Sequence, residues 1–212
     1  MSVTGFWIVG AVQDSEVARI RKDFPRLPAV GCLMPNFPAE LGWWKEESGS
    51  EGFFNQAGQH GPEPTASALR FRDFIDNSRI DSDLVEEMKE RVMELFPQCE
   101  GKDLFCASAR KGDPMAALSY ALGPTATLQL PGWFGDFLLS SEQVLAVLPN
   151  VESALTLSPD QRVVAVSRVR DWMTAMGDDP DHDADELLDG PLRVLRSAAR
   201  TGRAVAGQTR WY

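Results

Sequence analysis

The residues best suited to binding chemistry lie in one stretch, residues 36–64, which shows no sustained helical or strand periodicity. Large rigid aromatic surfaces beside hydrogen-bonding side chains are typical of ligand pockets and of interface hot spots. The stretch holds two aromatic pairs, and polar side chains follow the second pair closely. We therefore expect a binding site for a ligand or a partner that includes Trp43, Trp44, Phe53, Phe54, Asn55, Gln56 and His60.

The same aromatic side chains also have a purely structural interpretation. Ordering a long loop costs conformational entropy, and apolar anchors that pack on the core offset this cost. Loops of this length without secondary structure are uncommon and are usually functional or disordered. Disordered segments are poor in aromatic residues, so we expect residues 36–64 to be ordered. The sequence leaves open whether the aromatic rings face a partner or the core.

His60 is the strongest candidate in this chain for a general acid or base. An unperturbed imidazole has a pKa of about 6.5, which suits proton transfer near neutral pH. No catalytic partner for His60 is recognisable in the sequence, and its Gly-Gln-His-Gly-Pro surroundings are equally typical of a solvated turn. The other histidine, His182, lies within an acidic stretch, and we expect it to face solvent.

Two charged segments adjoin near the C-terminal end. Residues 178–189 hold seven carboxylates whose alternation resembles a calcium-binding loop. Ala184 and Gly190 stand where that loop needs a glycine and a bidentate glutamate, so we expect no metal and no cofactor. We expect the acids to complement the dipole of the following helix.

Four arginines follow at intervals of three, four and three, on one stripe of a helix: Arg193, Arg196, Arg200 and Arg203. We expect a solvated face. The alternatives are an anionic ligand, or ion pairs with the acids of an earlier predicted helix, Glu86, Glu87, Glu90 and Glu94.

Composition narrows the class of protein and of partner. The net charge of −10 repels a phosphate backbone, so nucleic-acid binding is not expected and a basic protein partner or a small molecule fits better. No apolar run is long enough to span a bilayer, and no basic leader follows Met1, so we expect a cytoplasmic protein.

The three cysteines show no Cys-x-x-Cys spacing and are interpreted as reduced thiols. Cys106 and Ser108 lack the Gly-x-Ser-x-Gly turn of a nucleophile.

The elements that must position these residues follow from periodicity, caps and breakers. Strands are predicted over residues 5–12, 27–34, 102–108 and 203–212, with a hairpin of 125–130 and 133–139. Helices are predicted from Asp14 to Pro25, from Thr65 to Ile75, from Asp83 to Phe96, over 114–122, from Ser140 to Pro149, from Ser158 to Gly177 and over 191–201. The pattern indicates a single α+β domain over residues 1–212, with a mixed or antiparallel sheet covered by several helices.

A weak internal repeat supports this class. The stretches that begin at Trp7 and at Trp133 align without a gap at an offset of 126 residues, and Ser15 and Glu16 match Ser141 and Glu142. Each stretch indicates a strand that runs into a helix. A real repeat implies two related halves, each with one strand in a common sheet and one helix that covers it.

Three segments of the chain, residues 9–17, 137–144 and 191–205, together resemble the YfbM-like family of small bacterial α+β proteins of unknown function. The resemblance covers about a third of the chain, and residues 36–64 depart from the family pattern. It implies an α+β fold and a bacterial origin, and it supplies no catalytic residues.

These observations favour a non-enzymatic binding protein, of a regulatory or immunity type, that uses the aromatic loop as its contact surface. The alternative is a small-molecule enzyme in which residues 36–64 form a lid and His60 acts as acid or base. The sequence is compatible with a homo-oligomer and does not specify the oligomeric state.

Overall fold

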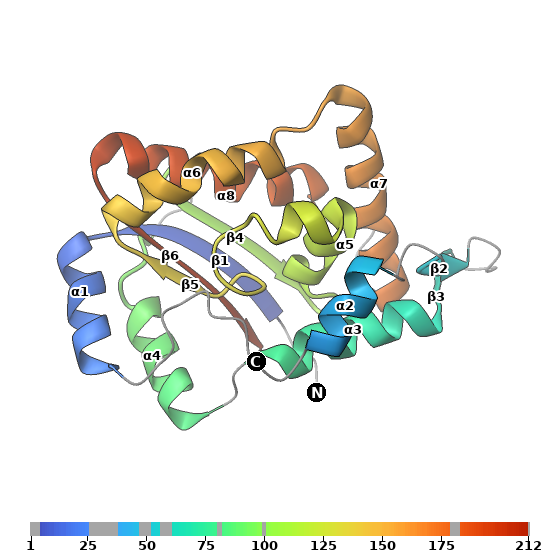
Figure 1. The fold of residues 1–212 in the computed structure, drawn as a ribbon, viewed down its shortest axis with the longest axis horizontal. Coiled ribbons are helices and arrows are strands. Elements are labelled where there is room, and N and C mark those ends of the chain that lie inside the picture. Colours follow the sequence, from blue (N-terminus) through green and yellow to red (C-terminus); the bar gives the residue numbers. More distant parts are fainter. Residues whose placement is uncertain are drawn as a thin grey trace.

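The computed structural model describes residues 5–25, 38–46, 52–55, 61–79, 82–98, 101–178 and 183–211. Four antiparallel strands form the main sheet in the order β4-β1-β6-β5 (Figure 1). These strands are β1 (Gly5–Val12), β4 (Leu104–Ala109), β5 (Phe137–Leu139) and β6 (Ala204–Trp211). The α+β class and the antiparallel sheet predicted from the sequence are confirmed.

Strand β1 is apolar along nearly its whole length because both faces of the sheet are covered. Its alternate side chains enter two separate cores: Trp7, Val9 and Ala11 point into the larger one, and Ile8 and Val12 into the smaller one. Helices α1 (Asp14–Asp23) and α4 (Asp83–Met93) complete the smaller core.

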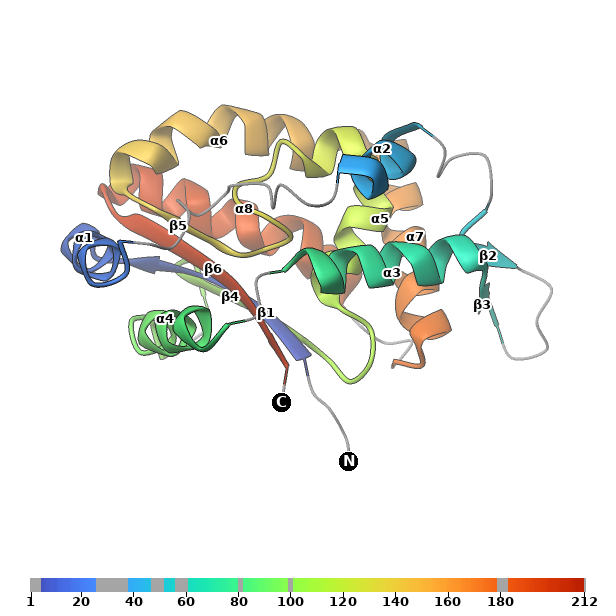
Figure 2. The same ribbon diagram turned by 60° about the horizontal axis from the view of Figure 1, so that its bottom comes forward.

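The larger core lies on the other face of the sheet, under α6 (Ser141–Leu155) and α8 (Ala184–Thr201) (Figure 2). Four further helices extend this layer beyond one end of the sheet: α2 (Pro38–Glu46), α3 (Ala66–Ser78), α5 (Pro114–Thr127) and α7 (Pro159–Met176). The short strands β2 (Phe54–Asn55) and β3 (Glu63–Pro64) pair beside α3.

Local capping signals fix several helix ends. Ser158 and Gln161 form the predicted capping box at the start of α7, and Gly177 ends that helix in the left-handed conformation. Ser140 and Gln143 form the second predicted capping box, at the start of α6. The N-cap of α4 is Ser82, one residue before the predicted Asp83.

The predicted hairpin is wrong, and two predicted helices are longer than expected. Residues 125–127 belong to α5, which kinks at Gly123, and β5 pairs with β6, so the predicted hairpin does not form. Helix α6 continues past Pro149 to Leu155, because burial of Val151 and Leu155 offsets the backbone hydrogen bond that a proline removes. Helix α8 begins at Ala184, seven residues before the predicted start. The predicted strand over residues 27–34 lies outside the described residues.

The two halves of the internal repeat have related but unequal places in the fold. Strands β1 and β5 flank β6 and run in the same direction, since each is antiparallel to β6. Each leads into a helix, but α1 and α6 cover opposite faces of the sheet. Asp14 links the two halves directly: its carboxylate accepts a hydrogen bond from the backbone N–H of Ser141 at 2.6 Å, at the start of α6.

Candidate functional site

The aromatic residues predicted to form a contact surface are largely inside the protein. Trp43, Trp44 and Phe53 keep only 8, 2 and 6% of their surface exposed and belong to the larger core. Phe54 is half-buried against this core, and Asn55 is exposed. Gln56 and His60, with Gln59, lie outside the described residues. Residues 36–64 are not one irregular loop, because 38–46 form α2 and 54–55 pair with 63–64.

A stack of rings with an arginine at each end holds this segment in place. The Phe53 ring lies between Trp43 and Tyr120, with centroids 6.5 and 4.9 Å away and nearly parallel planes. The guanidinium of Arg70 lies 4.2 Å from the Trp43 ring centre, and that of Arg168 lies 5.9 Å from the Tyr120 ring centre. These contacts join Trp43 and Phe53 to α3, α5 and α7. The faces of these rings are therefore occupied by the protein itself.

The described part of this region has a groove on α3 beside Glu40 of α2, with a volume of about 520 Å³. We call it the α2–α3 groove and define it by its lining residues: Glu40, Ala66, Leu69, Arg70, Asp73, Phe74 and Asn77. Six of the seven lie on α3 at positions separated by one helical turn or less, so they form one stripe of that helix. The groove has an apolar floor with polar groups beside it.

Charge in the groove is organised around one ion pair. Arg70 donates to both oxygens of Glu40, with Nε–Oε2 and Nη2–Oε1 distances of 2.8 and 3.1 Å. This hydrogen bonding lowers the pKa of Glu40 below its ordinary value, so the carboxylate stays ionised at neutral pH. Asp73, one turn further along α3, accepts two hydrogen bonds from its sequence neighbour Arg72, both at Oδ1.

The sequence did not single out Glu40, Arg70, Asp73 or Asn77. The available signal was weak: Asp73 and Asn77 are separated by four residues at the end of a predicted helix, which places them on one face. Such spacing is common on solvated helix faces. Only the position of α2 beside α3 makes a groove of that face.

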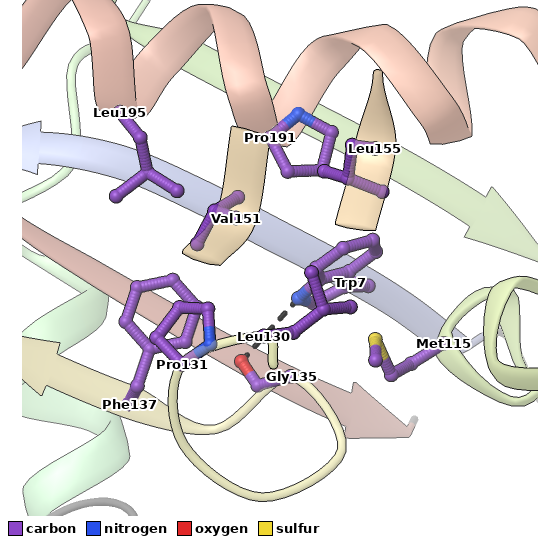
Figure 3. Close-up of a pocket in the computed structure, with 10 residues that line it drawn as sticks. All are labelled: Trp7, Met115, Leu130, Pro131, Gly135, Phe137, Val151, Leu155, Pro191 and Leu195. Carbon is purple, nitrogen blue, oxygen red and sulfur yellow. Dashed lines mark hydrogen bonds between the residues drawn. The ribbon is translucent and has the colours of Figure 1, made fainter. Parts of the chain in front are cut away.

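A second cavity lies between the sheet and the helices above it, and it is too small for a ligand (Figure 3). Its volume is about 10 Å³, close to the lower limit for one water molecule. The lining is apolar apart from backbone and the indole of Trp7, whose Nε1 donates to the carbonyl of Gly135 at 3.3 Å. We interpret this space as a packing defect.

Two buried cations hold the loop that precedes β5. Arg79 pairs with Asp113 and also donates to the carbonyl of Phe134 at 3.2 Å. Lys89 lies 3.2 Å from Asp136, whose other oxygen accepts from the backbone N–H of Thr209 at 2.7 Å. The backbone of Phe134 has a positive φ of 42°, a conformation that non-glycine residues adopt only when their surroundings impose it. The described contacts explain this loop as a structural junction.

Three of the four arginines of the predicted stripe pair with acids of the same chain, and the fourth, Arg200, is exposed. Arg193 pairs with Glu186 at 2.5 Å, Arg196 with Glu152 at 2.7 Å, and Arg203 with Asp103 at 3.2 Å. The predicted pairing with the acids of α4 is wrong. Of those acids, Glu86 and Glu90 pair with Arg210 at 3.2 and 3.8 Å, and Glu87 pairs with Arg91 at 3.6 Å.

Parts of the acidic stretch have specific structural partners. The carboxylate of Asp178 accepts hydrogen bonds from three successive backbone N–H groups of the β4–α5 loop, those of Arg110, Lys111 and Gly112. Asp185 and Asp189 both bind Arg162 of α7, at 2.7 and 2.6 Å. Asp183 caps α8 through the N–H of Glu186, as the dipole interpretation predicts. His182 lies outside the described residues.

The described residues offer neither a metal site nor a membrane-spanning helix. No group of three or more His, Cys, Asp or Glu side chains in that part of the chain is arranged to hold a metal ion. None of its helices combines the length and the apolar character needed to cross a bilayer.

Comparisons with protein-family models, with curated proteins and with solved structures gave no match. The resemblance to the YfbM-like family is neither supported nor contradicted by them and stays a prediction.

Proposed function

We propose that this chain is a non-enzymatic binding protein whose contact surface is the α2–α3 groove and whose partner is a basic protein segment. The observation that carries this proposal is the groove itself: about 520 Å³ of open volume over Leu69 and Phe74, with the carboxylates of Glu40 and Asp73 beside it. Grooves between helices receive the side chains of peptides and of partner helices.

Charge supports a basic partner. The chain has a net charge of −10, and the groove is lined by two carboxylates, Glu40 paired with Arg70 and the exposed Asp73 in contact with its neighbour Arg72. Opposite charge on the partner accelerates association and disfavours acidic competitors. A cytoplasmic regulatory or immunity-type protein that neutralises a basic partner fits these properties. A homo-oligomer remains compatible with the proposal.

The aromatic residues have an indirect role in this proposal. The buried rings of Trp43, Trp44 and Phe53 position α2 against α3 and so create the groove. Phe54 and Asn55 form β2 and do not line the groove. The enzyme alternative depends on a lid and on His60. His60 lies outside the described residues, and no described contact favours that alternative.

The proposal is tested by titrating the isotope-labelled protein with a synthetic amphipathic peptide of leucines and lysines and following backbone amide shifts by NMR. We expect shifts concentrated in α2 and α3. A peptide with glutamate in place of each lysine is expected to bind at least about tenfold more weakly, which corresponds to roughly 1.4 kcal/mol.

A pair of variants controls for non-specific apolar contact. Leu69→Ser changes the groove, and Leu145→Ser changes an exposed leucine on α6; the exposed fractions are 38 and 59%. We expect Leu69→Ser to weaken binding of the lysine peptide and Leu145→Ser to leave it unchanged. Equal effects of the two substitutions, or shifts spread evenly over the surface, would contradict the proposal.

A further inference from the structure

We infer that the α2–α3 groove recognises a lysine side chain of its partner, with the ammonium held by Asp73 and Asn77 and the aliphatic stem lying on Leu69. This inference rests on the proposed function and specifies which group of the partner is read. It follows from how the acceptors of the groove are already used within the protein.

Glu40 has little remaining capacity for a partner. Both of its oxygens accept from Arg70, in a bidentate pair that is the strong geometry for a carboxylate. Arg70 in turn packs on the face of Trp43, so releasing Glu40 would break two contacts at once. An incoming cation is therefore not expected to bind at Glu40.

Asp73 is the acid that a partner can reach. Its side chain is 60% exposed. Among the described residues, its carboxylate contacts Arg72 alone, through Oδ1. Adjacent residues on a helix do not face each other, so the Arg72 contact constrains Asp73 weakly. Oδ2 remains available to accept hydrogen bonds.

Asn77 supplies a second acceptor one helical turn away. Its Nδ2 donates to the backbone carbonyl of Asp73 at 2.7 Å, which orients the amide. Within the described residues, its amide oxygen Oδ1 accepts no hydrogen bond. Both residues line the groove one helical turn apart, so they lie on the same face of α3.

This arrangement favours an ammonium group over a guanidinium. An ammonium is a compact charge with three donors that can be shared between separate acceptors. A guanidinium binds a carboxylate best through both oxygens in one plane, and Arg72 already uses Oδ1 of Asp73. The four methylene groups of lysine can also cover Leu69, which is exposed beside Asp73.

The experiment compares three peptides that differ at one central position: lysine, norleucine, which keeps an aliphatic stem and lacks the charge, and arginine. Dissociation constants are measured by NMR titration at low ionic strength. We expect norleucine to weaken binding about two- to fivefold, as for an exposed ion pair, and arginine to bind more weakly than lysine.

Variants of the protein test whether Asp73 and Asn77 cause the difference in affinity between the lysine and norleucine peptides. Asp73→Asn is expected to remove most of the preference for lysine over norleucine, and Asn77→Ala to reduce it. Asp160→Asn, at an exposed acid in the first turn of α7, is expected to leave it intact.

The outcomes distinguish failure of lysine recognition from failure of groove binding. If all three peptides shift α2 and α3 with equal affinity, or if Asp73→Asn keeps the lysine preference, the inference is overturned and groove binding stands. Stronger binding of the arginine peptide also overturns the assignment to lysine. If none of the peptides shifts α2 or α3, the proposed function itself fails.

Discussion

The guanidinium of Arg79 lies 2.5 Å from the carboxylate of Asp113, and the two side chains are only 11 and 5% exposed. The other oxygen of Asp113 caps α5 by accepting from the N–H groups of Met115 and Ala116. Burial opposes the charged form of Arg79, but the carboxylates of Asp113, Asp136 and Asp76 outweigh it and raise the pKa above its ordinary value. Arg79 therefore stays charged, and the pair joins the end of α3 to the start of α5.

Replacing Arg79 by methionine is expected to lower the free energy of unfolding by about 3–5 kcal/mol, because Asp113 is left as a buried charge without its partner. Urea denaturation measures the change. Arg72→Met is the matched control: Arg72 pairs with an exposed carboxylate, and its loss should cost at most about 1 kcal/mol. Equal losses in the two variants would show that the Arg79 pair behaves as a surface pair.

Gly132 and Gly42 should respond to alanine in opposite directions. At Gly132 the backbone has a φ of 75°, and an added Cβ would lie 2.1 Å from the carbonyl oxygen of Asp136. We expect Gly132→Ala to destabilise the protein by about 2–4 kcal/mol. Gly42 lies inside α2 with no atom within 4 Å of the added Cβ, so Gly42→Ala should stabilise by about 0.5–1 kcal/mol. Thermal unfolding compares the two variants. Melting temperatures that shift in the same direction in both variants would contradict the prediction.

Asp178 should stabilise the β4–α5 loop through its three backbone hydrogen bonds. Asp178→Ala leaves the N–H groups of residues 110–112 without this acceptor, and we expect a loss of about 1–3 kcal/mol. Hydrogen exchange of these three amides should accelerate in the variant. Asp160→Ala, at the other end of α7, is the control and should cost at most about 1 kcal/mol through the helix dipole. Unchanged exchange at residues 110–112 would argue against this role of Asp178.

Tyr120 should make the protein less stable in alkali. Burial raises the pKa of its hydroxyl above the ordinary value near 10, although Arg168 opposes the shift. The folded state therefore keeps this proton to a higher pH than the unfolded state does. Its contribution to stability is fully present below pH 10 and is lost as the pH rises toward the folded pKa. The free energy of unfolding of Tyr120→Phe should fall less steeply above pH 10 than that of the original protein. Identical slopes would show that Tyr120 titrates normally.

The sequence alone determined those helices and strands whose ends depend only on nearby residues. The apolar run of β1, the capping box of Ser158 and Gln161, and Gly177 as the end of α7 each depend on neighbours within a few positions. Such interactions form in the same way in any surroundings, so the predictions of β1 and α7 are confirmed. The apolar patterns also sufficed for the α+β class.

Tertiary structure decided which residues face each other and which remain accessible. Strand β5 pairs with β6 because Gly207 leaves room for the ring of Phe137, a fit between residues 70 positions apart. Asp14 binds the start of α6, and Trp43 lies under Arg70 and does not form the expected contact surface. The α2–α3 groove likewise depends on tertiary packing, because Trp44 of α2 lies against Phe71 and Phe74 of α3. Burial and charge pairing depend on distances between segments remote in the chain, and a local pattern does not contain these distances.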